Sequence, residues 1–148
     1  MERETIGRPM EILLVEDDID DAGLTMEALK QGDVPCRVSL VRDGEEAMQF
    51  LRHARQFARA PRPDLILLDL QLPKMDGREV LSAVQADAEL RRIPVVVLTT
   101  SKMHREILQA EGLTVQHYLV KPVDRPQFLD VVKALRRDLL ADVIVPQS

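Results

Sequence analysis

The sequence has little cysteine and few aromatic side chains. Cys36 is its single cysteine, tryptophan is absent, and aromatic residues make up only 3% of the 148 residues. A lone cysteine excludes an intramolecular disulfide and a metal cluster built from cysteine thiolates. The core must therefore be built from Val, Leu, Ile and Ala, which suits buried parallel strands and amphipathic helices. Cys36 lies among strand-like residues, and we expect a buried, inert thiol.

A surplus of positive charge and a long apolar run are also lacking. The formal net charge is −5, whereas nucleic-acid-binding domains usually carry a basic face. We expect no nucleic-acid partner, and we interpret Arg91-Arg92 and Arg136-Arg137 as solvated helix ends. The apolar runs Leu65–Leu68 and Val95–Leu98 are too short to cross a membrane. Residues 1–10 contain no apolar stretch typical of a signal peptide, so we expect a cytoplasmic protein with no membrane partner.

Short apolar runs alternate with stretches of helical spacing, and the length fits one domain. The predicted strands are residues 11–16, 36–41, 64–69, 94–99 and 116–120. The predicted helices are residues 19–31, 44–58, 76–87, 102–111 and 124–141. Alternating strands and helices pair in parallel through right-handed crossovers. We therefore predict an α/β fold, a doubly wound five-stranded parallel sheet in the order 2-1-3-4-5, with a core over residues 10–141, a short N-terminal arm and a C-terminal tail.

Charged and polar side chains follow four of the predicted strands. Ligands of open parallel sheets bind beyond the carboxyl ends of the strands. In chain order, those ends carry Glu16 and Asp17, then Asp69, Thr99 and Lys121. Three neighbouring carboxylates repel one another unless a cation neutralises them. Mg²⁺ is the natural candidate, because it is a hard ion that prefers oxygen ligands and retains exchangeable waters.

The same residues suit phosphoryl transfer to a carboxylate. Asp69 follows an apolar run that would hold it rigidly, as a nucleophile attacking phosphorus requires. The metal, Lys121 and Thr99 would then stabilise the three phosphoryl oxygens. Taken alone, each residue has an ordinary structural explanation; Asp18 or Asp20, for example, would cap the first helix. Their ordered occurrence at four strand ends favours the functional interpretation.

These residues lie in motifs that resemble bacterial response-regulator receiver domains, and the resemblance extends over residues 10–141. The motifs are Leu14-Val15-Glu16-Asp17-Asp18, Leu67-Leu68-Asp69-Leu70, Pro73-Lys74-Met75-Asp76-Gly77, Thr99-Thr100-Ser101 and Lys121-Pro122. More narrowly, the chain is similar to single-domain response regulators that serve phytochrome photoreceptor kinases. The segments that carry this similarity are residues 60–69 (APRPDLILLD), 78–81 (REVL) and 90–101 (LRRIPVVVLTTS).

The resemblance implies a flavodoxin-like receiver fold and a role for each site residue. Asp69 would be the phosphoacceptor. The implied ligands of Mg²⁺, direct or through water, are Glu16, Asp17, Asp69 and the backbone carbonyl of Gln71. The implied phosphoryl-binding and switch residues are Thr99, Lys121 and the aromatic Tyr118.

Some positions depart from the family's commonest pattern or tune its chemistry. Thr100 stands where the family usually has a smaller Ala or Gly, which would alter access to the site or the rate of hydrolysis. The side chains of Gln71 and Ser101 occupy positions that tune the lifetime of the phosphoryl group. The resemblance also implies a cis bond between Lys121 and Pro122.

The implied partner is a sensor histidine kinase of the phytochrome type. With no effector domain in the sequence, output would pass through a surface, and we expect a homodimer. Its expected interface combines the fourth helix, fifth strand and fifth helix with the apolar tail Val143-Ile144-Val145. The histidines His53, His104 and His117 are not spaced as metal ligands, so we expect ordinary surface or packing roles.

Three other functions deserve comparison with a phosphorylated signalling module that is not a metabolic enzyme. An aspartate-nucleophile phosphatase typically needs a second acid two residues after the nucleophile, where this chain has Gln71. A phosphorylation-independent adaptor with this fold usually lacks the aspartate or the lysine, and both are present. A nucleotide-binding flavodoxin-like protein would need a glycine-rich loop after the first strand, which the sequence lacks.

Overall fold

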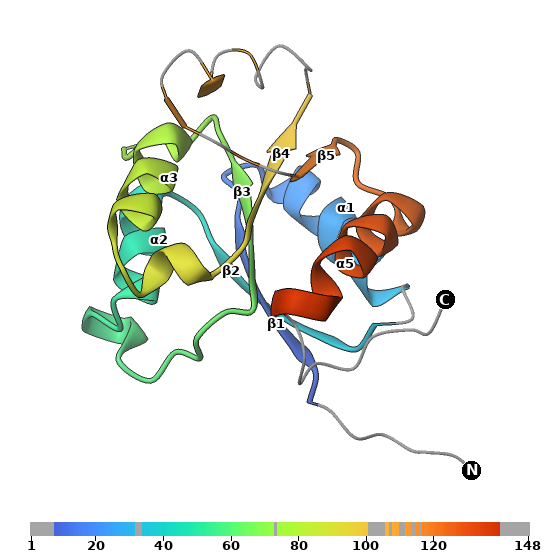
Figure 1. Ribbon diagram of the computed structural model, residues 1–148, viewed down its shortest axis with the longest axis horizontal. Helices are drawn as coiled ribbons and strands as arrows, with labels where there is room; N and C mark the ends of the chain where they lie inside the picture. The colour runs from blue at the N-terminus through green and yellow to red at the C-terminus, as the bar shows by residue number, and fades with distance from the viewer. Residues whose placement is uncertain are drawn as a thin grey trace.

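The computed structural model describes residues 8–31, 34–72, 74–100 and 117–139, together with residues 106, 108, 109, 112, 113 and 115. Five parallel strands form one sheet in the order β2-β1-β3-β4-β5, as predicted (Figure 1). The strands are β1 (Met10–Val15), β2 (Cys36–Val41), β3 (Leu65–Asp69), β4 (Val95–Thr99) and β5 (His117–Val120). Each strand begins and ends within one residue of its predicted bounds.

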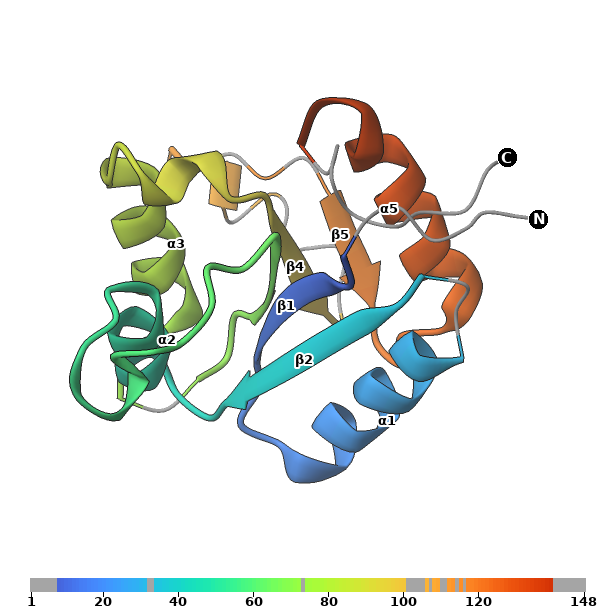
Figure 2. The ribbon, with the colours of Figure 1, turned by 90° about the horizontal axis from the view of Figure 1, so that it is seen from below.

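Helices cover both faces of the sheet. On one side lie α1 (Ile19–Lys30) and α5 (Arg125–Leu139), and on the other lie α2 (Gly44–Leu51) and α3 (Gly77–Ala86), as Figure 2 shows. Short 3₁₀ helices, η1 (Arg55–Phe57) and η2 (Leu90–Arg92), precede β3 and β4. The central strands β1 and β3 are buried on both faces because helices pack on either side, so their sequences read as continuous apolar runs.

An aspartate caps the start of each of the first three helices. Asp18 accepts hydrogen bonds from the backbone N–H groups of Asp20 and Asp21, so Asp18 rather than Asp20 caps α1. Asp43 caps α2, and Asp76 forms a reciprocal capping box with Glu79 at the start of α3. Each cap satisfies N–H groups that would otherwise lack partners in the first helical turn. All three helices therefore begin near the carboxyl ends of the strands, at the edge of the sheet where the candidate site lies.

The prediction of one helix over residues 44–58 was wrong. Helix α2 ends at Leu51, and His53 adopts a left-handed backbone conformation with φ of 55°. The N–H of Ala54 donates to the carbonyl of Gln49, and the N–H of His53 donates to that of Phe50. This is the Schellman arrangement, which normally uses glycine at the left-handed position. Because histidine stands there instead, the sequence carried no signal for the end of the helix.

The remaining helix predictions differ from the structure by one or two residues where residues are described. The predicted helix over 102–111 lies mostly outside the described residues, of which 106, 108 and 109 are helical. The tail Val143–Val145 also lies outside them. Within the described residues, no helix is both long and apolar enough to cross a membrane.

Two glycines allow the loops beside the carboxyl ends of the strands to pack closely. A Cβ on Gly77, the first residue of α3, would lie 2.6 Å from the Cα of Leu70 and would overlap the carbonyl oxygen of Asp69. A Cβ on Gly44, the first residue of α2, would overlap the backbone of Met75. These contacts hold the segment after β3 against the starts of α2 and α3, and so constrain the position of Asp69.

We predict that Gly77→Ala destabilises the protein by about 1–3 kcal/mol, because backbone atoms must move to admit the methyl group. Gly23→Ala is the matched control: Gly23 lies inside α1 with open space around it. That change should leave stability equal or raise it by up to about 1 kcal/mol, since alanine is the better helix former. Urea unfolding of both variants measures the difference, and equal stability of the two would contradict the close-packing account.

Candidate functional site

Strand register brings the predicted site residues to one edge of the sheet. Val15 pairs with Leu68, so the next residues along β1 and β3, Glu16 and Asp69, are neighbours. The other two residues come from β4 and β5, where Thr99 pairs with Val120, the residue before Lys121. These strand ends lie at the top of Figure 1. The predicted convergence of carboxylates, hydroxyl and lysine at this edge follows from the pairing alone.

The ammonium of Lys121 lies between two buried carboxylates. Its Nζ is 2.8 Å from Oδ2 of Asp69 and 2.6 Å from Oε1 of Glu16, and it also contacts Oδ2 of Asp21 at 3.3 Å. Glu16 is fully buried, Asp69 is 8% exposed, and the Lys121 side chain is 11% exposed. Two carboxylates so shielded from water need a counter-charge, and Lys121 provides it.

Glu16 holds a proton more readily than an ordinary glutamate. Burial and then the adjacent carboxyl of Asp69 raise the pKa of Glu16 to about 7 from 4.5, and Lys121 offsets this only in part. Oε2 accepts the N–H of Asp18 at 3.2 Å. Oε1 makes the 2.6 Å ion pair with Lys121 but has no hydrogen-bond donor of suitable geometry. Glu16 Oε1 is therefore held by the charge of Lys121 rather than by a well-aligned hydrogen bond.

Asp69 behaves in the opposite way. Burial alone would raise the pKa of Asp69, but hydrogen bonds with Glu16, Lys121 and the N–H of Gln71 bring it below its ordinary value of 3.8. The Gln71 N–H lies 3.0 Å from Oδ1. For Lys121, burial would lower the pKa, but Asp69 and Glu16 together raise it above its ordinary value. At neutral pH, Asp69 is thus an ionised carboxylate held by an ammonium, which leaves it able to act as a nucleophile.

Asp17 lies at the exposed rim of the site. Its side chain is exposed, whereas its backbone carbonyl accepts hydrogen bonds from Nε and a terminal nitrogen of Arg42 at 3.2 and 3.0 Å. Arg42 follows β2, so it ties the loop after β1 to the neighbouring strand end. Among the contacts of the described residues, none involves the Asp17 carboxylate. This exposed carboxylate is therefore accessible to a ligand.

The other predicted residues divide into buried and exposed ones. Thr99 is buried at the end of β4, and Tyr118 is partly buried against the apolar cluster on the α3 side of the sheet. The side chains of Gln71 and Thr100 are exposed at the rim. Ser101 lies outside the described residues. The bond between Lys121 and Pro122 is cis, as predicted.

Two contributors were missed at the level of sequence. Asp21 lies in the first turn of α1 and contacts Lys121. The only signal in the sequence was its place in the run of acidic residues that follows the first strand. Arg42 carried no such signal, since its contact with Asp17 joins segments 25 residues apart.

Cys36 and the histidines stand outside this site. Cys36 is partly buried rather than fully buried, and burial raises the pKa of its thiol to about 11, so the thiol is unreactive at neutral pH, as expected. His53 is exposed beyond α2, and His117 is partly buried at the start of β5. His104 lies outside the described residues.

The donor set suits a hard divalent cation but is not a closed cage. Among the described residues, no three acidic, histidine or cysteine side chains already converge as a metal-binding group. Lys121 fills the space between Glu16 and Asp69 and supplies the charge that a cation would otherwise provide. The exposed Asp17 carboxylate is accessible to a hydrated ion, which prefers oxygen ligands, and the Glu16 carboxylate would face that ion if Lys121 exchanged partners.

We predict that the metal-free protein loses stability as the pH rises from about 4.5 to about 7. The pKa of Glu16 is higher in the folded state than in the unfolded state, so its protonation stabilises the fold below pH 4.5 and this contribution is lost above pH 7. Glu16→Gln should remove a change on the order of 2–3 kcal/mol from the profile. Urea unfolding at several pH values in a chelator measures it; parallel profiles for the two proteins would show that Glu16 does not titrate in this range.

Comparison with known proteins agrees with this geometry. The sequence model of the response regulator receiver domain family matches residues 12–133. The response regulator Rcp1 of Synechocystis sp. is 41% identical over 140 residues, which is 95% of each chain.

Solved structures agree as well. The bacteriophytochrome response regulator AtBRR is 36% identical with a TM-score of 0.82, and the match covers 95% of this chain and 99% of that one. The phosphorylated cyanobacterial phytochrome response regulator RcpA is 45% identical with a TM-score of 0.73, covering 95% and 100%. Rcp1 itself has been solved with Mn²⁺ bound. The chain belongs to the response regulator receiver domain family and is homologous to phytochrome response regulators.

Proposed function

We propose that Asp69 accepts a phosphoryl group from a phosphohistidine of a sensor kinase. The observation that carries this proposal is the buried, ionised Asp69 with Lys121 Nζ at 2.8 Å. An Oδ atom of Asp69 attacks phosphorus, the P–N bond to the histidine breaks, and its electron pair leaves with the imidazole. The phosphoryl group adds negative charge beside Asp69, and the Lys121 ammonium is already within reach of it.

Two further residues would respond to the phosphoryl group. The Thr99 hydroxyl lies at the end of β4, beside β5, and would donate to a phosphoryl oxygen. Tyr118 lies in register with Val97, two residues before Thr99, and is partly buried. Movement of Thr99 toward the phosphoryl group would leave space for Tyr118 to turn further inward. This couples the site to the surface beside β5.

Mg²⁺ is the cation that we propose for this site. Glu16, Asp17, Asp69 and the Gln71 carbonyl would hold it, directly or through water. When bound, it would neutralise carboxylate and phosphoryl oxygens. The donor oxygens of this chain support the proposal, with Asp17 exposed at the rim of the site and Glu16 beside Asp69. A relative, Rcp1, binds Mn²⁺ in its solved structure, and Mn²⁺ often substitutes for Mg²⁺ at oxygen sites.

The same geometry argues against an aspartate-nucleophile phosphatase. That class needs an acid two residues after the nucleophile. At this position Gln71 has an exposed carboxamide, which cannot act as a general acid or base. We therefore propose that the chain takes part in its own phosphoryl transfer and hydrolysis and is otherwise not an enzyme.

The phosphodonor that we propose is a phytochrome-type histidine kinase. Its support is the homology to Rcp1, RcpA and AtBRR. Large apolar side chains are exposed on α1 beside the site, Ile19 at 61% and Leu24 at 56%. Exposed apolar side chains near a reaction site are typical of a protein-binding surface, which favours a protein donor over a small molecule.

The remaining sequence predictions stand as part of the proposal. The chain would act as a receiver domain in the cytoplasm. Its output would pass through a two-fold dimer that uses the fourth helix, β5 and α5, with residues 143–145 packing on the partner. The apolar character of that tail and the exposed Val120, 42% accessible on β5, support this face.

We predict that Asp69→Asn abolishes phosphorylation and preserves the fold, because the amide has nearly the volume of the carboxylate but no nucleophilic oxygen. Incubation with Mg²⁺ and acetyl phosphate, followed by mass spectrometry, locates the labelled residue. Asp76→Asn, at the start of α3, is the control and should label normally. Labelling of folded Asp69→Asn at another residue would falsify the assignment.

We predict that Asp17→Ala weakens Mg²⁺ binding by about tenfold or more, the scale on which even outer ligands act. The side chain is exposed and its carbonyl contacts remain, so thermal stability without metal should be unchanged or higher. Asp20→Ala removes a nearby exposed carboxylate and should bind Mg²⁺ within about twofold of the original chain. A calorimetric titration measures the Mg²⁺ affinity of both variants, and thermal unfolding without metal measures their stability. Clear destabilisation of metal-free Asp17→Ala would mark Asp17 as structural instead.

We predict that the full chain is a dimer in light scattering and that a version ending at Asp142 dissociates more readily, because it lacks the apolar tail. A monomeric full chain, phosphorylated or not, would refute the dimer. Dimerisation unchanged by truncation would refute the role of the tail alone.

A further inference from the structure

The arginines of this acidic chain are unevenly distributed. Residues 47–63 contain four arginines and a histidine but no acidic residue. Arg91 and Arg92 follow about 30 residues later, in η2. The six side chains, Arg52, Arg55, Arg59, Arg62, Arg91 and Arg92, are all exposed, and we call them the arginine face.

The fold gathers these arginines at the amino ends of the strands, opposite Asp69. Arg62 donates to the carbonyl of Glu89 at 3.0 Å, which ties the loop before β3 to the start of η2. Hydrogen bonds from Leu90 and Glu89, and then the nearby Arg52 guanidinium, lower the pKa of Asp87. Arg52 and Arg62 therefore lie beside the connection that carries Arg91 and Arg92.

Positive charge predominates on this face. Among the described residues, none of the six arginines forms an ion pair with an acidic side chain within 4.0 Å. Asp87 and Glu89 lie in the same connection as Arg91 and Arg92, and the carboxylate of Asp87 already accepts the N–H groups of Glu89 and Leu90. The guanidinium groups are therefore available to an external anion.

The loop that carries Arg52 to Arg59 is held in place rather than loosely attached. Phe57 packs on Phe50 of α2 with ring centroids 5.3 Å apart. His53 and Arg55 both adopt a left-handed backbone conformation. Non-glycine residues keep this costly conformation only where the surrounding structure enforces it. The loop thus presents its arginines in a fixed arrangement, which lowers the entropic cost of binding.

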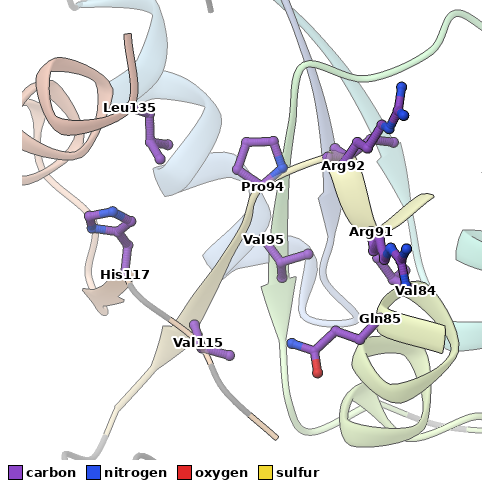
Figure 3. A pocket seen from close by; sticks show the side chains of 10 residues that line it. Val84, Gln85, Arg91, Arg92, Pro94, Val95, Val115, His117 and Leu135 are labelled. Carbon is purple, nitrogen blue, oxygen red and sulfur yellow. The ribbon is translucent and has the colours of Figure 1, made fainter. Parts of the chain in front are cut away.

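An apolar groove of about 540 Å³ adjoins the arginine face. In Figure 3, Arg91 and Arg92 lie on one side of Pro94 and Val95, and Leu135 of α5 lies on the other. Val115 contributes further apolar surface. The volume falls within the range of ligand-binding clefts in proteins. Cationic side chains therefore stand at the edge of a recess that suits aliphatic groups.

We propose that the arginine face and its groove bind an acidic, aliphatic segment of a partner protein. Guanidinium groups bind carboxylates through two parallel hydrogen bonds, which lysines cannot do. Leucine- or isoleucine-sized side chains of the segment would occupy the groove. Nucleic acid matches less well, because single strands stack on exposed aromatic rings, and no Phe, Tyr or Trp lines the groove. This binding is independent of Asp69 and adds a second interaction surface to the proposed signalling function.

The test measures, by fluorescence anisotropy, how tightly the full chain binds a labelled synthetic peptide in which glutamates alternate with leucines. Arg91→Glu combined with Arg92→Glu should weaken binding by about tenfold or more, since like charges then face the peptide. The matched control, Lys30→Glu with Arg37→Glu, makes the same charge change on exposed side chains near the other edge of the sheet and should alter affinity less than twofold. Asp69→Asn should bind as the original chain does.

Further probes separate the contributions of charge and groove. A glutamate–serine peptide and a single-stranded DNA oligonucleotide should each bind at least tenfold more weakly than the glutamate–leucine peptide. Equal affinity for either probe would overturn the proposal, since the groove would then contribute nothing. Equal weakening by the control pair would reduce the effect to net charge and overturn it too. Binding only after removal of residues 140–148 would assign the groove to the chain's own tail instead.

Discussion

The ammonium of Lys121 between the carboxylates of Glu16 and Asp69 is the interaction on which the site depends. Two buried carboxylates at the ends of neighbouring strands would repel each other strongly, and the lysine from the end of β5 offsets that repulsion. The offset is unequal: Asp69 stays ionised, whereas burial leaves Glu16 with a pKa of about 7. The charges of the cluster are therefore balanced in the folded state, and Asp69 remains a nucleophile that can react.

The rest of the fold supplies the precision that this arrangement requires. Strand register places Glu16 beside Asp69, and Gly77 allows α3 to begin against the backbone of Asp69. Asp18 caps α1 and thereby orients Asp21 toward Lys121. Buried apolar strands hold these ends rigid, so charge can change at the edge of the sheet without disturbing its core. The arginine face lies at the opposite ends of the strands, where it is insulated from that change by the sheet.

Prediction from sequence succeeded where the pattern is local and failed where structure depends on distant contacts. Apolar runs followed by Glu16, Asp69, Thr99 and Lys121 were enough to predict the strands, and the usual strand order of such a fold then predicted their common edge. The end of α2 was missed because His53 takes a position that usually requires glycine. The exchangeable role of Lys121 as counter-ion was missed because it depends on side-chain distances. The arginine face was missed because its members come from two loops that only the fold brings together.

A structure of the protein with Mg²⁺ and beryllium trifluoride, which mimics a phosphoryl group on Asp69, tests the role of Lys121 most directly. If Lys121 is a counter-ion that can exchange partners, its Nζ will leave Glu16, now 2.6 Å away, and contact a fluorine on the Asp69 adduct. Glu16 should then face the metal. An adduct on Asp69 with the Lys121–Glu16 ion pair still intact would contradict this account, because the lysine would then be a fixed structural cation.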